Sequence, residues 1–151
     1  MALFGEKFLS KLEMQSLSEV IAEAEKNTSG EIRVVVRRRR HWKERKLQLP
    51  EVALNEFHRL GMGKTRDRTG VLIMLLMSER KFQIIADEGI HAKVEEGTWD
   101  RFASEMSEHF KDGRFYHGIS ETIRAVGSEL AKHFPRKSDD TDELSNEIIE
   151  Q

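Results

Sequence analysis

The sequence predicts an α/β fold, with helices packed on a small mixed β-sheet. Two apolar runs, 71–77 and 82–86, flank a short polar turn, which is typical of a buried antiparallel hairpin. A third run, 32–36, is rich in β-branched residues and is separated from the hairpin by a helical stretch. Segments with helical periodicity precede and follow these strands, and we expect them to form the helices of the fold.

The first helix is expected to run from Ser10 to about Lys26. Ser10 and Glu13 have the spacing of a capping box, in which each side chain accepts a hydrogen bond from the other's backbone. Apolar residues then recur on one face, which we expect to pack on the sheet: Met14, Leu17, Val20, Ile21 and Ala24. The breaker 27–30 ends this helix and leads into the strand 32–36.

The second helix is expected to begin near Pro50, because proline suits the first helical turn. Its apolar face comprises Ala53, Leu54, Phe57 and Leu60, and Gly61 or Gly63 ends it. Strand 32–36, this helix and strand 71–77 then form a right-handed crossover, which makes the two strands parallel and the sheet mixed.

The hairpin turn sets the register of the two strands that follow the crossover. A turn centred on Ser78 and Glu79 places Asp87 opposite Gly70 and Asp67 opposite Ile90. Both carboxylates then meet at one edge of the sheet. They are joined there by Arg66, Arg68 and Gly89, and this corner is the candidate site.

Two more helices are expected after the hairpin. Thr98 can cap the first, whose inward face comprises Trp99, Phe102, Ala103, Met106 and Phe110. The last helix carries Ile119, Ile123, Val126 and Leu130 on one face and ends before Pro135. We therefore expect a single domain over residues 1–137, followed by an acidic tail, 138–151, that lacks a packing period.

Composition excludes several classes of chemistry. The chain has no cysteine, so disulfides, thiolate zinc sites and thiol nucleophiles are excluded, and a metal would be bound by oxygen or imidazole ligands. G-x-S-x-G, Walker, H-E-x-x-H and Rossmann motifs are absent from the sequence. Charged residues interrupt the N-terminus before a signal-peptide core can build up, which predicts a cytoplasmic protein without a membrane span.

Charge is unevenly distributed. Eight basic residues and one acid lie between Arg33 and Lys46, whereas 138–151 contains six acids and no base. The run Arg37 to Arg40 with Trp42 allows a nucleic-acid interface, because arginine contacts phosphates and tryptophan stacks on bases. No RNP, KH or helix-turn-helix pattern accompanies it, so we expect a solvated loop and no nucleic-acid partner. The basic run and the acidic tail can also neutralise each other.

Several motifs occur together in one order: TSGEIRVVV at 28–36, then DRTGVLIMLLMSERKFQIIADEGIHAKVEEGTWD, then FYHGISETIRAVGSELAKHFP at 115–135. In this respect the chain resembles the TPM domain, the family of the thylakoid-lumen acid phosphatase and photosystem-II repair proteins, and in particular its short soluble bacterial type. The resemblance implies a three-layer α/β sandwich, with helices on both faces of a small mixed β-sheet. It also implies divalent-metal binding and, in some members, weak phosphatase activity. It extends to the acidic tail, for which a free and a tethered state both remain open.

The predicted cation is Ca²⁺ or Mg²⁺, and the predicted ligands are carboxylates. Asp67 and Asp87 are the first pair, and Glu31 belongs to the same edge because parallel strands begin together. The resemblance makes Asp100 a predicted ligand, because the pair Trp99-Asp100 follows Asp87-Glu88-Gly89 at the family's usual interval. Glu96 is a further candidate ligand. The alternatives are ion pairs with arginine, a capped strand end, and acids that stabilise a helix dipole.

Two functions follow from this corner, a divalent-cation-binding domain with weak phosphatase activity and a cation-stabilised protein-interaction module. A bound cation polarises a phosphoryl oxygen and generates a water nucleophile. In a phosphatase, Asp87 would hold the cation and Arg68 would offset charge on the phosphoryl group of a small molecule or protein. His91 would be a general acid, a ligand or neither.

Overall fold

The computed structural model describes residues 9–65, 68–137 and 144–151. Its centre is a four-stranded sheet in the order β3-β2-β1-β4, formed by β1 (Glu31–Arg37), β2 (Gly70–Leu76), β3 (Lys81–Ala86) and β4 (Ile149–Glu150). β1 and β2 are parallel, whereas β2 and β3 form an antiparallel hairpin. The predicted mixed sheet and its crossover are confirmed.

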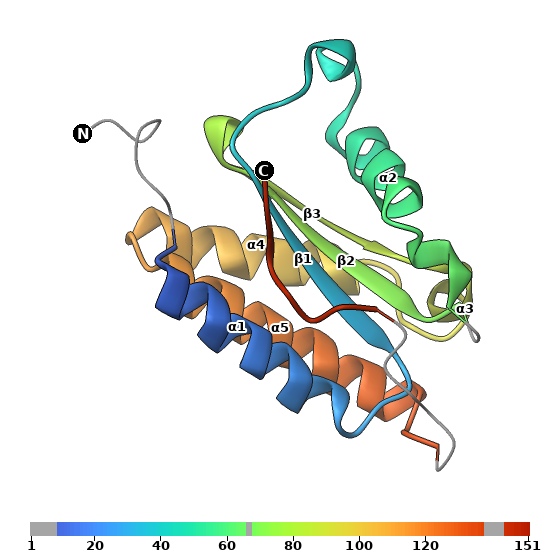
Figure 1. The fold of residues 1–151 in the computed structure, drawn as a ribbon. Coiled ribbons are helices and arrows are strands. Elements are labelled where there is room, and N and C mark those ends of the chain that lie inside the picture. The colour runs from blue at the N-terminus through green and yellow to red at the C-terminus, as the bar shows by residue number, and fades with distance from the viewer. Residues whose placement is uncertain (1–8, 66–67, 138–143) are drawn as a thin grey trace.

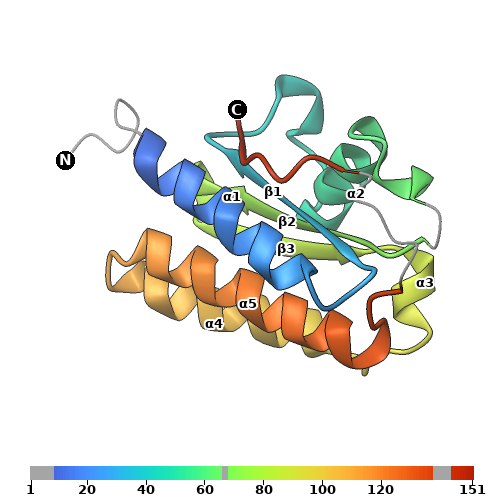
Figure 2. The same cartoon turned by 60° about the horizontal axis from the view of Figure 1, so that its bottom comes forward.

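Helices cover both faces of this sheet, as expected for a three-layer α/β sandwich (Figures 1 and 2). One layer comprises α1 (Lys11–Glu25), α4 (Thr98–Lys111) and α5 (Phe115–His133), and the other comprises α2 (Leu49–Arg59). Shorter elements join them: α3 (Glu88–His91) and the 3₁₀ turns η1 (Trp42–Glu44), η2 (Met62–Lys64) and η3 (Met77–Glu79). None of the helices in the described ranges is long and apolar enough to cross a membrane.

Alternation along β2 divides the apolar residues into two cores. Val71, Ile73 and Leu75 pack in the core beneath α1, α4 and α5, whereas Leu72 and Met74 pack in the core beneath α2. Every residue of β2 is buried, because the strand is central and covered on both faces. This explains why its sequence is a continuous apolar run without alternation.

The helix termini follow the predicted chemistry at α1 but not at α4. Ser10 and Glu13 form the capping box, with reciprocal hydrogen bonds of 3.0 Å. At α4 the N-cap is Gly97, with φ 87°, and Thr98 is the first helical residue. The Thr98 hydroxyl donates to the Glu95 carbonyl at 2.7 Å, so the prediction of Thr98 as the cap is wrong.

The C-terminal residues form a strand that the sequence did not predict. β4 pairs in parallel with β1, and the backbone N–H of Gln151 donates to Val36 at 2.9 Å while Arg38 N–H donates to Gln151 at 3.1 Å. Ile149 and Leu144 pack against the core beneath α2. A strand of two residues at the end of a polar segment is too short to show the alternation that indicates a strand.

Candidate functional site

The candidate site lies at the edge of the sheet where β1 and β2 begin and β3 ends. Asp87 N–H donates to the Gly70 carbonyl at 3.0 Å, which confirms that Asp87 lies opposite Gly70. Glu31 is the register partner of Gly70 on the other side. These three residues form a row across adjacent strands, and two strand spacings of about 4.8 Å separate the backbones of Glu31 and Asp87 by roughly 10 Å.

Asp87 is a buried carboxylate, 5% exposed, that is held in place from two directions. It is the N-cap of α3, where its Oδ1 accepts the backbone N–H of Glu88 at 2.7 Å. Arg68 Nε lies 3.2 Å from Oδ2 and 3.4 Å from Oδ1. The sequence missed α3 because a single helical turn has no periodicity to detect.

Arg68 is a surface residue that is held close to Asp87. Its backbone is in the left-handed region, with φ 57°, and its carbonyl accepts the N–H of Gly89 at 3.1 Å. The hydrogen bond with Asp87, and then the charges of Asp87 and Glu88, raise the pKa of Arg68 above its ordinary value. The guanidinium is thus a counterion of the Asp87 carboxylate.

A pocket of about 500 Å³ lies next to this corner, between the end of β3 and the segment from α3 to α4. Three of the predicted site residues line it together: His91, Glu96 and Asp100. Glu95, an acid without a predicted role, lines it as well. Asp100 is in the first turn of α4, so it also satisfies the alternative of stabilising the helix dipole.

The remaining predicted ligands of the cation are Glu31 and Asp67. Glu31 is buried on the β1 side of Gly70, and its Oε1 accepts the backbone N–H of Leu144 at 2.8 Å. Asp67 lies outside the described residues, so the predicted meeting of Asp67 and Asp87 remains a prediction. Among the residues that are described, no group of three or more His, Asp or Glu side chains is arranged to hold one metal ion.

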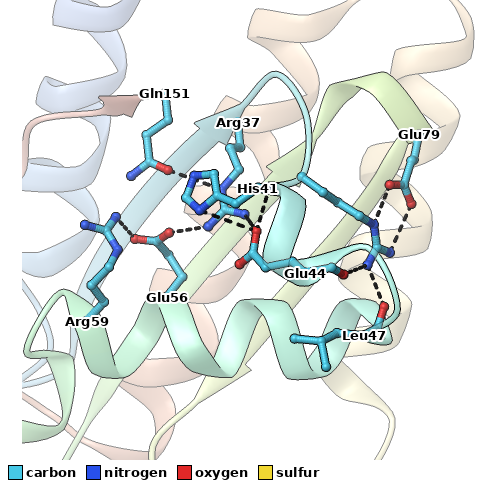
Figure 3. A network of polar contacts seen from close by, with 9 residues as sticks. Arg37, His41, Glu44, Leu47, Glu56, Arg59, Glu79 and Gln151 are labelled. Carbon is cyan, nitrogen blue, oxygen red and sulfur yellow. Dashed lines mark hydrogen bonds and ion pairs between the residues drawn. The ribbon is translucent and has the colours of Figure 1, made fainter.

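A second polar cluster, which the sequence did not predict, lies at the opposite end of β1 (Figure 3). Arg37, only 2% exposed, forms ion pairs with Glu44 and Glu56, and its Nε donates to Gln151 Oε1 at 3.2 Å. Glu56 also pairs with Arg59. The expectation that the arginine run is solvated is therefore wrong for Arg37, because three elements converge on it.

Comparison with known proteins places this architecture in a family. The model of the TPM domain matches residues 5–129. No curated protein matched the chain. Among solved structures, the BA42 protein from the psychrophilic bacterium Bizionia argentinensis is 36% identical, with full coverage of both chains and a TM-score of 0.87.

Two more distant structures share the fold. The N-terminal domain of a P. gingivalis protein has 20% identity and a TM-score of 0.69, covering 84% of this chain and 79% of that one. The N-terminal domain of the cg2496 protein from Corynebacterium glutamicum has 12% identity and a TM-score of 0.62, with coverages of 93% and 83%. From the family match over most of its length and the helix-covered mixed sheet, we conclude that the chain belongs to the TPM domain family.

Proposed function

We propose that this TPM domain binds a divalent cation, Ca²⁺ or Mg²⁺, at the corner formed by the start of β2 and the end of β3. The observation that carries the proposal is the state of Asp87. Its carboxylate is nearly buried, is oriented by the Glu88 N–H, and has the charge of one exposed guanidinium as its counterion. A buried carboxylate with an exchangeable counterion beside an acid-lined pocket is a natural first ligand for a hard cation.

The donors around Asp87 fit a cation that keeps part of its hydration. Ca²⁺ takes about six to eight oxygens and Mg²⁺ retains several waters. Asp87 would bind directly, together with Asp67 and main-chain carbonyls, while Asp100 and Glu96 on the pocket wall would bind through water. Among the residues that the structure describes, no three His, Asp or Glu side chains are placed to bind one ion together. We therefore expect a low affinity for the cation.

Arg68 has a specific part in this proposal, as an internal competitor of the cation. In the structure its guanidinium neutralises Asp87. A divalent cation at Asp87 would displace that guanidinium by charge repulsion, and the released Arg68 would keep only its weaker ion pair with Glu88, at 3.7 Å. It would then attract an anionic ligand such as a phosphate ester.

Weak phosphatase activity is the second candidate function. A cation at this position would polarise a phosphoryl oxygen and lower the pKa of bound water. Arg68 would bind the phosphoryl oxygens, and His91 on the pocket wall would donate a proton to the leaving group. The matching family model is itself named for a phosphatase. No hydroxyl or thiol side chain is among the described pocket residues, so binding without turnover, in an interaction module, ranks first.

Thermal unfolding with and without added Ca²⁺ or Mg²⁺ tests the cation proposal. A ligand at about 100 times its Kd stabilises the native state by about 2.7 kcal/mol, so the wild-type Tm should rise. Asp87→Asn should abolish the rise while it keeps the N-cap of α3, because asparagine caps helices as well as aspartate does. Asp112→Asn, an exposed acid at the other end of α4, is the matched control and should retain the full rise.

Arg68→Gln separates this mechanism from adventitious binding. Removing the competitor should tighten cation binding by about two- to fivefold, as expected for loss of an exposed ion pair. A full Tm rise in the Asp87→Asn, Asp67→Asn double variant would place the cation elsewhere. Hydrolysis of an aryl phosphate that ends with chelation and in Asp87→Asn would establish the enzyme, whereas hydrolysis that survives both would rule it out at this site.

A further inference from the structure

A cationic surface lies at the end of the sheet opposite the candidate site. It combines the loop after β1 with the turn between β2 and β3, which the hydrogen bond from Ser78 N–H to the Arg38 carbonyl joins at 2.8 Å. We call this surface the cationic tip and define it by its exposed basic residues and one tryptophan. They are Arg38, Arg39, Trp42, Lys43, Arg45, Lys46, Arg80 and Lys81.

The tip is cationic because the acids of its two turns are already paired with arginines. Glu44, the acid of the η1 turn, pairs with the buried Arg37. Glu79, the acid of the β2–β3 turn, pairs with Arg40 at 2.5 Å. Within the part of the chain that the structure describes, none of the seven exposed bases forms an ion pair, although the charge of Lys81 acts on Glu79 from further away.

Trp42 stands among these charges with 74% of its surface exposed. It is the only tryptophan, tyrosine or phenylalanine in the described ranges whose side chain is exposed. The Arg45 guanidinium lies 3.9 Å from the ring centroid and covers one face. In Figure 1 the η1 turn projects beyond the end of the sheet, away from the layer of α1, α4 and α5.

The shape of the tip is fixed before any partner binds. Arg40 donates to the carbonyls of Glu44 at 2.9 Å and Leu47 at 2.5 Å, and the His41 N–H donates to the Glu44 carboxylate at 2.9 Å (Figure 3). This network holds an apolar ring in water at a convex point. The ring is thus exposed and fixed in place, so a partner can contact it without reorganising the turn.

We propose that the cationic tip docks on the surface of an anionic lipid bilayer. Tryptophan prefers the headgroup level of a membrane, where its ring is in apolar surroundings and its N–H is wet. Each Lys or Arg at an anionic leaflet strengthens binding by about fivefold. Trp42 and the surrounding bases therefore supply the two weak signals that peripheral attachment needs.

The geometry favours a bilayer over a nucleic acid. Single-stranded nucleic acid binds in cationic grooves where successive aromatic rings stack on successive bases. The tip instead offers one ring, with one face already covered by Arg45, on a projecting turn. Bound in this orientation, the domain would keep the pocket lined by His91 and Asp100 at the far end of the sheet, facing water.

Co-sedimentation with vesicles tests the proposal. We expect binding to phosphatidylcholine vesicles that contain about 30% phosphatidylglycerol at about 50 mM salt, and its loss at about 500 mM salt. Lys43→Glu with Lys46→Glu should weaken binding by at least about twentyfold. Lys64→Glu with Lys132→Glu makes the same change in net charge in η2 and α5, and should change binding by no more than about threefold.

Trp42 provides a second, independent measurement. In a Trp99→Phe background the fluorescence reports Trp42 alone, and anionic vesicles should shift its emission to the blue. Trp42→Ser, at an exposed position that the fold does not need, should weaken co-sedimentation. Absence of binding at low salt, an unshifted emission, or undiminished binding in Lys43→Glu with Lys46→Glu would overturn the proposal. Tip-dependent binding to a single-stranded oligonucleotide that exceeds vesicle binding would replace it with a nucleic-acid partner.

Discussion

Replacement of Arg37 by methionine should destabilise the domain more than any exposed charge removal. The Arg37 side chain is 2% exposed and pairs with Glu44 and with Glu56, whose side chain is fully buried (Figure 3). Methionine fills most of the volume of the aliphatic stem but cannot neutralise either carboxylate. The variant therefore leaves buried negative charge with weakened compensation.

The magnitude follows from what remains around the two acids. Breaking a buried ion pair from one side costs about 3–5 kcal/mol. Glu56 keeps the half-exposed Arg59, and Glu44 keeps the His41 N–H, which places the loss near the lower end, about 3 kcal/mol. For a domain of this size, about 3 kcal/mol lowers the Tm by roughly 6–12 °C.

Urea unfolding of wild-type, Arg37→Met and the exposed control Arg39→Met measures this loss, with the control expected within about 0.5 kcal/mol of wild-type. The double variant with Glu56→Met should recover part of the stability, because it removes the orphaned charge as well. A loss below about 1 kcal/mol in Arg37→Met, or a double variant less stable than the single one, would refute the reasoning.

The loss of stability in Arg37→Met should also depend on pH. Burial alone raises the pKa of Glu44, but hydrogen bonds from the His41 N–H and from Arg37 outweigh it, so the pKa lies below its ordinary value of 4.5. A depressed carboxylate pKa stabilises the fold above the ordinary value and loses this contribution as pH falls through the folded value. The difference between wild-type and Arg37→Met should therefore shrink on acidification, and a difference that grows would contradict this account.

Three further predictions concern the fold around the two ends of the sheet. Glu79→Gln should cost up to about 1 kcal/mol near neutral pH and nothing below the folded pKa, because Arg40 lowers the pKa of Glu79; urea unfolding across pH measures this. Gly127→Ala should lower the Tm, since a Cβ there would lie 2.7 Å from the Ala24 Cβ and overpacking costs about 1–3 kcal/mol. Deletion of residues 149–151 should cost at least about 2 kcal/mol, because it removes both backbone hydrogen bonds of Gln151 together with the pairing of β4 and β1, and it should accelerate amide exchange along β1.

The fold was largely predictable because its signals are local and periodic. The hairpin register followed from the turn at Ser78 and Glu79, and Pro50 in the first turn of α2 and the capping box of α1 marked helix starts. What could not be predicted are pairings between distant segments. β4 joins β1 across more than one hundred residues, and no pattern in two residues records its partner.

The candidate site was predictable only in part, for the same physical reason. Strand register placed Asp87 opposite Gly70, but the pairing of Asp87 with Arg68 depends on a left-handed backbone at Arg68 that composition does not indicate. His91, Glu96 and Asp100 meet in one pocket because α3 and the start of α4 turn back beside β3. Glu31 belongs to the same edge, yet strand spacing keeps it about two strands from Asp87.

The two proposals concern opposite ends of one rigid element, and this determines how their tests relate. β2 has seven residues, so about 20 Å separate the Gly70 end from the η3 turn. At physiological ionic strength the Debye length is about 8 Å, so charges on the two ends are screened from each other. Asp87→Asn should therefore leave vesicle binding by the cationic tip unchanged, and Lys43→Glu with Lys46→Glu should leave the cation-dependent Tm rise unchanged. A change of either property by the distant substitution would require a conformational link through the sheet, because direct electrostatics is too short-ranged to provide one.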